Sequence, residues 1–393
     1  MSTPGVFFAP LIKEFGWSHA RVSSLASAIT LGTIPGSIAA EFVLERMDAR
    51  IPITSGAMLT AASLLFASQA NSYFPLLLSC FFAGLGVGMA TLLPISLVIA
   101  NWFREKRGIA MGVAIAGVSA GGMVMVQLAA AAIRAGGWRA GYVALALPIL
   151  LIPVPLTVVA VRTRPPDEPH RAAIMHPKEE VISNPPELEG FSLAEAVEMR
   201  SFWLIAAATF LFAFTVYGIL TQLVVYLIGI GYQPSTAAIV LGLMLGFNAA
   251  GKVGFGIVAD RIGARVAMAV SFAIIACGIV LLLCSREGLL LASFLAIYGP
   301  AWGSARVALI PLLTIESLGL KHYGSLGGTL RIAEATGSVL GPLTIGRIFD
   351  LTNSYRPAFA LSILCAIVGM LATLGCKDFR STAIIANELR VQA

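Results

Sequence analysis

Four charged side chains lie inside long apolar runs of the sequence, away from the ends of those runs. They are three cations and one anion, namely Lys252, Arg306, Arg331 and Glu334. A charge at the centre of a bilayer costs several kcal/mol unless it is paired or hydrated, so such residues are candidates for function. The excess of positive charge predicts a site that is completed by a small anion.

Lys252 and Arg306 are the candidates for binding this anion. Lys252 precedes the predicted end of its apolar run by six residues, so a lysine that reaches to the membrane interface is the alternative. Arg306 follows Gly299–Gly303, where the glycines and a proline can loosen a helix and Trp302 could stack on an apolar substrate body. Structural pairing is the alternative for Arg306.

Arg331 and Glu334 are three residues apart, so they share one face of a helix and a mutual salt bridge is the simplest interpretation. The functional alternative is that Glu334 gains and loses a proton, because burial and a nearby cation together can tune a carboxyl group. The first half of the chain offers uncharged polar candidates in its apolar runs, which are Thr91, Ser96, Ser119 and Gln127.

The composition indicates a protein whose solvent is mostly lipid. Of the 393 residues, 58% are hydrophobic and only 12% are charged, whereas soluble domains carry about 25% charged residues. Runs of about 20 apolar residues can cross a bilayer, and eleven are predicted, at 22–43, 51–70, 74–99, 108–133, 140–161, 202–227, 235–258, 266–284, 289–316, 323–348 and 357–376. Residues 5–12 resemble only the tail of a twelfth, so we expect a first span that is largely missing.

Residues 162–200 interrupt the apolar pattern with prolines and charges, which predicts a solvated linker. Ser192 and Glu195 have the spacing of a capping box, so the linker is expected to end in a short interfacial helix, with a plain linker as the alternative. The predicted domains are an N-terminal bundle (1–161), this linker, a C-terminal bundle (201–376) and a tail (377–393).

The two sets of spans repeat each other in sequence. Glu45–Arg50 matches Asp260–Arg265, the glycines of 108–121 match those of 324–337, and Trp138–Tyr142 matches Tyr355–Phe359, at offsets of 215 to 217 residues. Three matches in one order at nearly constant spacing indicate duplication, as in many transporters. The glycine pairs Gly117/Gly121 and Gly337/Gly341 are expected to serve helix packing.

The basic residues predict the orientation of the chain. If the linker, the C-terminal tail and the loops after even-numbered spans are cytoplasmic, they hold sixteen Lys and Arg residues, against six in the opposite loops. The net charge of +6 is therefore interpreted as a topology signal rather than as a nucleic-acid footprint. We expect an integral protein of the cell membrane.

The segment Gly256–Arg265 joins two spans through a tight cytoplasmic turn, where an Asp–Arg set can pair across helix ends and be broken by movement. It resembles the signature loop of the major facilitator superfamily. That resemblance implies an all-α integral membrane fold of two six-helix bundles in pseudo-twofold repeat. The first-half copy departs from the signature at Glu45 and Asp48. The implied gating residues are Glu45, Arg46, Arg50, Arg107, Asp260, Arg261 and Arg265.

Within the superfamily the chain is similar to the monocarboxylate and oxalate–formate branch. The similarity rests on Gly5–Pro10 with Phe15–Ser18, on Trp102–Gly112, on Gly136–Arg139, and on Glu334 with Gly341–Pro342 and Gly346–Asp350. The branch implies transport of small organic anions, often with protons. Lys252 occupies the position of the branch's substrate-binding arginine, and Asn248 replaces the aspartate one turn earlier. The branch's lysine on span one has no counterpart here.

The sequence therefore predicts a secondary carrier of small carboxylates that works by alternating access, either by proton symport or by exchange for a counter-anion. Lys252, Arg306, Asn248 and Trp302 are the predicted binding residues, and Glu334 with Arg331 the coupling pair. A proton-driven exporter of amphiphiles and a non-transporting sensor on the same fold are the alternatives. No enzyme activity, cofactor or metal site is expected, since the five cysteines stand singly, and a monomer is predicted.

Overall fold

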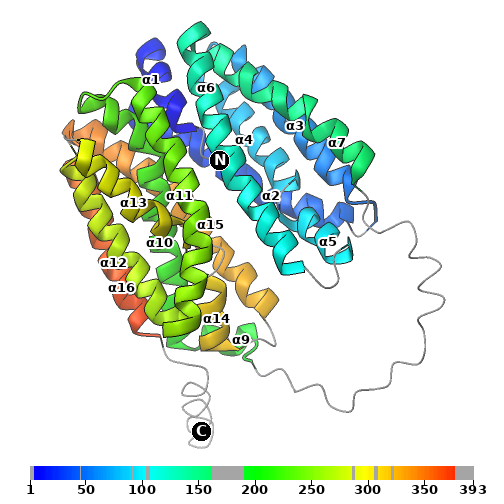
Figure 1. The fold of residues 1–393 in the computed structure, drawn as a ribbon, viewed down its shortest axis with the longest axis vertical. Coiled ribbons are helices and arrows are strands. Elements are labelled where there is room, and N and C mark those ends of the chain that lie inside the picture. Colours follow the sequence, from blue (N-terminus) through cyan, green and yellow to red (C-terminus); the bar gives the residue numbers. More distant parts are fainter. Residues whose placement is uncertain are drawn as a thin grey trace, which may run out of the picture. The chain divides into compact units, whose positions relative to one another are not determined.

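The computed structural model describes residues 4–44, 46–90, 92–102, 107–161, 190–285, 288–304, 309–319 and 323–376. Within these ranges the regular structure is helical, apart from an isolated antiparallel bridge between Gly190 and Gly319. The helices, shown in Figure 1, are α1 (Pro4–Phe15), α2 (His19–Leu44), α3 (Arg50–Ser68), α4 (Tyr73–Ala90), α5 (Leu92–Trp102), α6 (Arg107–Leu151), α7 (Pro153–Ala160), α9 (Leu193–Val197), α10 (Arg200–Gly229), α11 (Pro234–Ile262), α12 (Ala264–Leu283), α13 (Gly288–Ser304), α14 (Ile310–Leu318), α15 (Tyr323–Thr352) and α16 (Arg356–Leu374).

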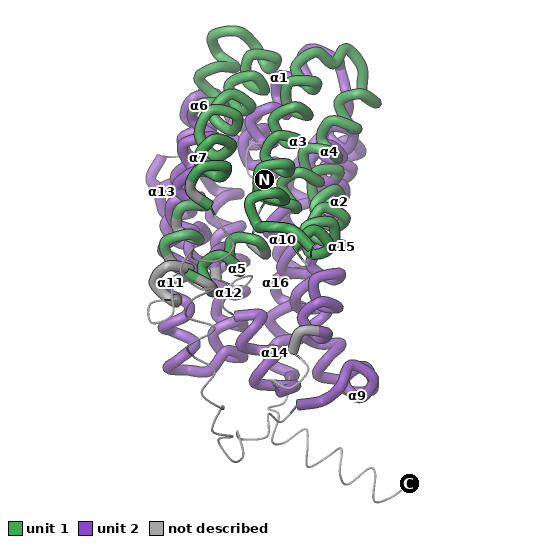
Figure 2. Tube along the Cα trace, turned by 90° about the vertical axis from the view of Figure 1, so that its right-hand side faces the viewer, with its two compact units in different colours: residues 1, 28–118, 128–187 green, residues 2–27, 119–127, 188–393 purple. Residues whose placement is uncertain are grey.

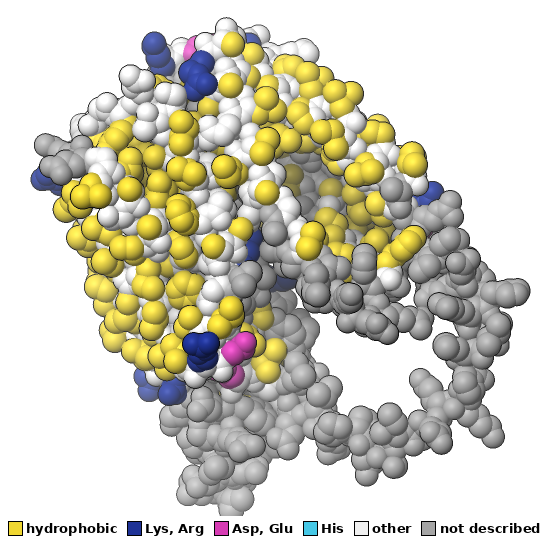
Figure 3. All heavy atoms as spheres, in the orientation of Figure 1, with side chains coloured by type: hydrophobic (Ala, Val, Ile, Leu, Met, Phe, Trp, Pro, Cys, Tyr) yellow, Lys and Arg dark blue, Asp and Glu magenta, His cyan; other side chains and the backbone are white. Residues whose placement is uncertain are grey.

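Eight of the described helices are long and apolar enough to cross a membrane. A helix suits that setting because it satisfies its backbone hydrogen bonds internally where no water is present. Large apolar side chains also point outward, among them Phe74 (69% exposed), Val159 (80%) and Leu289 (77%). Figure 3 shows one face of the compact unit that contains residues 188–393. On this face, apolar side chains cover the sides of the helices. Such a surface is stable in lipid.

The predicted spans and the helices agree closely in position, as for 202–227 and α10. The span 108–133 and the first part of 140–161 fall in one element, α6, which is broken by non-helical conformations at Gly136 and Gly137. The rest of the span 140–161 forms α7. Gly137 has φ +77°, a value that glycine adopts without strain, so this glycine pair turns the chain between two spans. Predicted spans 74–99 and 289–316 each include residues outside the described ranges.

The capping box predicted at the end of the linker is confirmed. The Ser192 hydroxyl accepts the backbone N–H of Glu195 at 3.3 Å, and the Glu195 carboxylate accepts the backbone N–H of Ser192 at 3.0 Å. The helix that begins here is α9. Just before it, the backbone N–H of Phe191 donates to the carbonyl of Leu318 at 3.0 Å. This bond fixes the start of α9 to the end of α14.

The chain forms two compact units, drawn in different colours in Figure 2. Unit 1 comprises residues 28–118 and 128–187 together with Met1, and unit 2 comprises 2–27, 119–127 and 188–393. Two segments of the first half of the sequence, 2–27 and 119–127, therefore pack with the second half. The domain division at the linker, which follows the sequence repeat, stays a prediction.

Glycines bring the helices of unit 1 together. The backbones of Gly84 and Gly88 on α4 lie directly against α2, at Ile29 and Thr33. Gly86, between them, faces α3, where an added Cβ would lie 2.5 Å from the carbonyl oxygen of Gly56. Small residues are the means by which helices in lipid approach each other closely. The alternating glycines of α4 thus serve two helix contacts at once.

Unit 2 is built from helix pairs. The helix α10 packs along α15 and α16, α13 packs along α11 and α12, and α1 lies on α10. Gly337 and Gly341 on α15 meet the backbone of α10 at Phe210 and Phe214, which confirms the packing role predicted for this pair. The role predicted for Gly117 and Gly121 is not supported, because an added Cβ at either would meet no described atom within 4 Å.

Substituting Gly84 by alanine should destabilise unit 1. The new Cβ would collide with the carbonyl of Ile29, and overpacking of this kind typically costs about 1–3 kcal/mol. Thermal unfolding of the purified protein in detergent measures the loss. The matched control is Gly117→Ala, whose Cβ has open space. Equal melting temperatures for the two variants would contradict the proposed helix contact.

Candidate functional site

The site begins with a close contact between α11 and α13. Gly251 on α11 lies against the backbone of Pro300, and Gly303 on α13 lies against the backbone of Asn248. At Gly299 an added Cβ would be 2.6 Å from the Cβ of Phe247. Since almost no side chain separates the two helices, the α11 backbone from residue 247 to 251 is tightly positioned. Asn248 projects from this stretch, and Lys252 follows directly after it, one helical turn further on.

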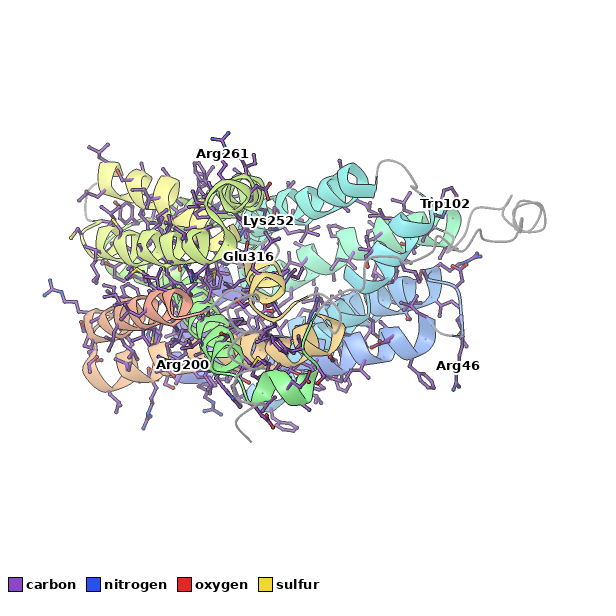
Figure 4. The ribbon with its side chains drawn as sticks, turned by 90° about the horizontal axis from the view of Figure 1, so that it is seen from below. Arg46, Trp102, Arg200, Lys252, Arg261 and Glu316 are labelled. Atoms are coloured by element: carbon purple, nitrogen blue, oxygen red, sulfur yellow. The ribbon has the colours of Figure 1, made fainter. Side chains whose placement is uncertain are left out.

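Lys252 directs its ammonium group to a hydroxyl from the first half of the sequence. Its Nζ donates to Ser119 Oγ at 3.0 Å, and Ser119 Oγ in turn lies 3.5 Å from Asn248 Oδ1, a long hydrogen bond. Ser119 and Asn248 are 5% and 7% exposed, and Lys252 is half-buried. Figure 4 shows Lys252 on α11. A contact with a buried hydroxyl favours the site interpretation over a lysine that reaches for the interface.

Gln127 anchors the same α6 segment eight residues further on. Its Nε2 donates to the carbonyl of Ala238 at 2.9 Å, and Gly242 leaves room for the amide, since a Cβ there would lie 2.5 Å from Nε2. Ser119 and Gln127 were both predicted as polar candidates. The structure brings each to α11, Ser119 to the site and Gln127 to a backbone carbonyl, where it positions the segment.

The other predicted residues lie on other helices or outside the described part of the chain. Arg306 and Thr91 lie outside the described residues, and Ser96 is on α5 in unit 1. Trp302 is half-buried on α13 beside Gly303. Arg331 is exposed and Glu334 half-buried, one turn apart on α15. Their roles stay predictions.

The predicted gating residues of the first half make local contacts. Arg50 Nε lies 3.2 Å from Asp48 Oδ1, which also accepts the backbone N–H of Arg50. The Arg46 guanidinium lies 4.2 Å from the centre of the Phe42 ring, and Figure 4 labels this arginine. Glu45 and the side chain of Arg107 lie outside what the structure describes. The Asp48–Arg50 pair orders the start of α3.

The corresponding loop of the second half is tied to the end of α16. Arg265 Nη1 donates to the carbonyl of Cys376, just beyond α16, at 2.9 Å. Asp260 and Arg261 are exposed on the last turn of α11, and Arg261 points outward in Figure 4. The turn itself uses Gly263 with φ +81°. Arg265 thus holds the loop to the end of α16.

Glu316 is a residue that the sequence analysis missed. Both of its carboxylate oxygens accept the backbone N–H of Ala264, at 3.0 and 3.1 Å, at the first residue of α12. A negative charge at a helix N-terminus is favourable because the unpaired N–H groups and the helix dipole are positive there. Its signal in the sequence was an acidic residue in the last turn of the predicted span 289–316.

The model of one protein family, the Major Facilitator Superfamily, matches residues 1–342 of the chain. This chain is a member of the Major Facilitator Superfamily. The superfamily resemblance predicted from the signature loop is therefore confirmed, and the protein is an integral membrane transporter of this superfamily.

Curated relatives of this superfamily member cover most of the chain at low identity. Monocarboxylate transporter 12 of Xenopus laevis is 24% identical over 94% of this chain and 84% of its own. The oxalate:formate antiporter of Oxalobacter formigenes is 25% identical over 91% and 83%. Monocarboxylate transporter 13 of Bos taurus is 26% identical over 94% and 84%. The resemblance to this branch is thus confirmed.

A solved structure shows the same fold. A bacterial homologue of the human lysosomal transporter Spinster, in an inward-facing and occupied conformation, matches with a TM-score of 0.67. It is 17% identical, and the match covers 95% of this chain and 90% of that one. At that identity, the match shows that this superfamily member shares the fold and carries no further argument about its function.

Replacing Glu316 by alanine should weaken the N-terminal cap of α12. Loss of a capping side chain typically costs about 0.5–2 kcal/mol, which is measurable as a lower melting temperature in detergent. The control is Glu198→Ala, which removes an exposed carboxylate after α9. A melting temperature for Glu316→Ala no lower than that of the control would show that the cap adds nothing to stability.

Proposed function

We propose that this superfamily member is a secondary carrier of small organic anions, of the monocarboxylate or oxalate class, that works by alternating access. The proposal assigns Lys252 and Arg306 to the substrate carboxylate, and Asn248 and Trp302 to the rest of the substrate. Glu334 with Arg331 responds to protonation or occupancy. The charged residues of the two signature loops act in gating, and they are Glu45, Arg46, Arg50, Arg107, Asp260, Arg261 and Arg265.

The observation that carries this proposal is the half-buried ammonium of Lys252 with a neutral hydroxyl, Ser119 Oγ, at 3.0 Å. A hydrogen bond between two ionised groups is about twice as strong as one between neutral groups. A carboxylate that reaches Lys252 is therefore a better acceptor than Ser119 and would displace it. Lysine acts here as a point charge and lacks the two-pronged fork of arginine, which suits carboxylates of varied orientation.

This displacement would link substrate binding to movement. Ser119 belongs to the first half of the sequence repeat and Lys252 to the second, so their hydrogen bond joins the halves. When a substrate takes the place of Ser119, that bond between the halves is exchanged for a bond to the substrate. A ligand shifts a conformational equilibrium only through a difference in its affinity for the two states. The exchange supplies such a difference.

The names of the relatives support the substrate class, since they include monocarboxylate transporters and an oxalate:formate antiporter. Coupling is by proton symport or by exchange for a second anion. Asn248 replaces a carboxylate at the Lys252 site, so Glu334 is the proposed proton-binding group for symport. The bias of the basic residues supports a cell-membrane location with the linker and C-terminus in the cytoplasm.

Substitution of Lys252 by glutamine should impair uptake of carboxylates by proteoliposomes. We expect KM for labelled lactate, pyruvate, oxalate or glycolate to rise about tenfold or more, because a hydrogen bond to a charged group contributes about 1.5–3 kcal/mol. Lys252→Arg should restore much of the affinity. The assay is run with and without an inward proton gradient, which separates symport from exchange.

The matched control is Lys13→Gln, which removes an exposed cation of unit 2 in the last turn of α1. A KM for Lys252→Gln equal to that of the control would remove Lys252 from the site. If folded protein moves only cations or neutral solutes, the anion assignment itself is wrong.

A further inference from the structure

A carboxylate of the second half of the sequence caps a helix of the first half. Asp350, in the last turn of α15, accepts the backbone N–H of His19 on Oδ1 at 2.7 Å and that of Ala20 on Oδ2 at 2.9 Å. These N–H groups form the start of α2 and have no partner within their own helix. Asp350 therefore acts as the N-terminal cap of α2 although it lies more than 300 positions away in sequence.

The contact continues along one face of each helix. Ser27 Oγ, two turns into α2, donates to the carbonyl of Val339 on α15 at 2.8 Å. Between these ends Gly346 meets the first turn of α2, where an added Cβ would lie 2.8 Å from Ser23 Oγ and 2.9 Å from the backbone nitrogen of Ala20. The glycine thus allows the carboxylate of Asp350 to reach the helix end.

A buried polar network that links α2 to α10 and Tyr355 stabilises the same contact. Gln222 on α10 donates to Ser23 Oγ at 2.6 Å, and the Tyr355 hydroxyl donates to Gln222 Oε1 at 3.1 Å. The same hydroxyl lies 3.0 Å from Nδ1 of His19. Gln222 and Ser23 are fully buried. Leaving such groups buried without partners is unfavourable, so the network favours one register of α2 over any shifted one.

We propose that this contact is a gate, with Asp350 as the residue that sets how readily it opens. The α2–α15 latch consists of His19, Ala20, Ser23 and Ser27 on α2 with Val339, Gly346 and Asp350 on α15. In a carrier that works by alternating access, the halves must part at one end of the molecule at a time. The latch joins the halves at the end where α15 terminates, so it must break when that end opens.

Asp350 dominates the latch because its two bonds are charge-assisted, whereas the bonds of Ser27 and Gln222 join neutral groups. Its two hydrogen bonds to α2 both go to backbone N–H groups, so the role proposed for it is to position the helix. The proposal concerns the transport cycle of a superfamily member and holds whatever the substrate. The predicted orientation places the latch on the outer side of the membrane.

The test measures access to a buried reporter in the latch. Ser27, which is 3% exposed, is replaced by cysteine in a full-length chain whose five native cysteines are replaced by serine or alanine. A membrane-impermeant maleimide is added to right-side-out and to inside-out vesicles. A separate Asn353→Cys variant, at an exposed position just after α15, identifies which face of the membrane the latch faces.

Three variants decide the outcome. Asp350→Asn keeps the shape but loses the charge and one acceptor, and Gly346→Ala wedges α2 away from α15. From the face marked by Asn353, both should label the Ser27 cysteine about tenfold faster or more, on the order expected when a charge-assisted hydrogen bond is lost. Gly328→Ala, on the same helix but with open space around its Cβ, should label at the parental rate.

The side of labelling separates a gate from a simple structural cap. General loosening would raise labelling from both faces, and that result, or an Asp350→Asn rate equal to that of Gly328→Ala, would overturn the proposal. If Gly346→Ala does not give monodisperse protein, Asp350→Asn decides alone. The readout does not depend on transport, so failure of the anion assignment and failure of the gate are distinguishable.

Discussion

The absence of water from the bilayer interior is the constraint on which the rest of this structure depends. Every backbone N–H and C=O within the hydrocarbon must find its partner inside the protein, which accounts for an architecture made of helices in the described part of the chain. The same constraint governs side chains. Some buried hydroxyls bond to a carbonyl of their own helix, as Thr209 does, whereas Lys252 and Gln222 bond to side chains of another helix. A buried polar residue here is costly unless it has a hydrogen-bond partner, and a partner on another helix also joins the two helices.

Apolar side chains cannot perform this joining alone, because lipid tails solvate them as well as other helices do. Close packing and hydrogen bonds must supply the specificity. The contact of α11 with α13 illustrates the consequence, since Gly251 and Gly303 each meet the backbone of the other helix. Asn248 and Lys252 therefore project from a rigid stretch of backbone. The glycines that pack the helices are what position the site.

The fold could be predicted from the sequence because its main signals are local or repeated. Apolar runs mark α10 and α12, and the repeat relates the halves. Ser119, Asn248 and Lys252 were each singled out as well, but not their contact, which joins residues 133 positions apart. Glu316 and Asp350 were missed as caps because hydropathy shows a charge near a helix end without showing which helix N-terminus it will meet.

The two connections between the halves within unit 2 differ in the kind of partner that could break them. Ser119 is a neutral acceptor for a cation, so a stronger acceptor from solution can replace it. Asp350 is already a charged acceptor on backbone donors, and a substrate anion would be repelled rather than drawn in. A carrier needs one connection that its substrate can break. It also needs another connection that keeps the helices in place until the first has broken. Hydrogen bonds suit both tasks, because each can be exchanged for a bond to substrate or to water when a helix moves.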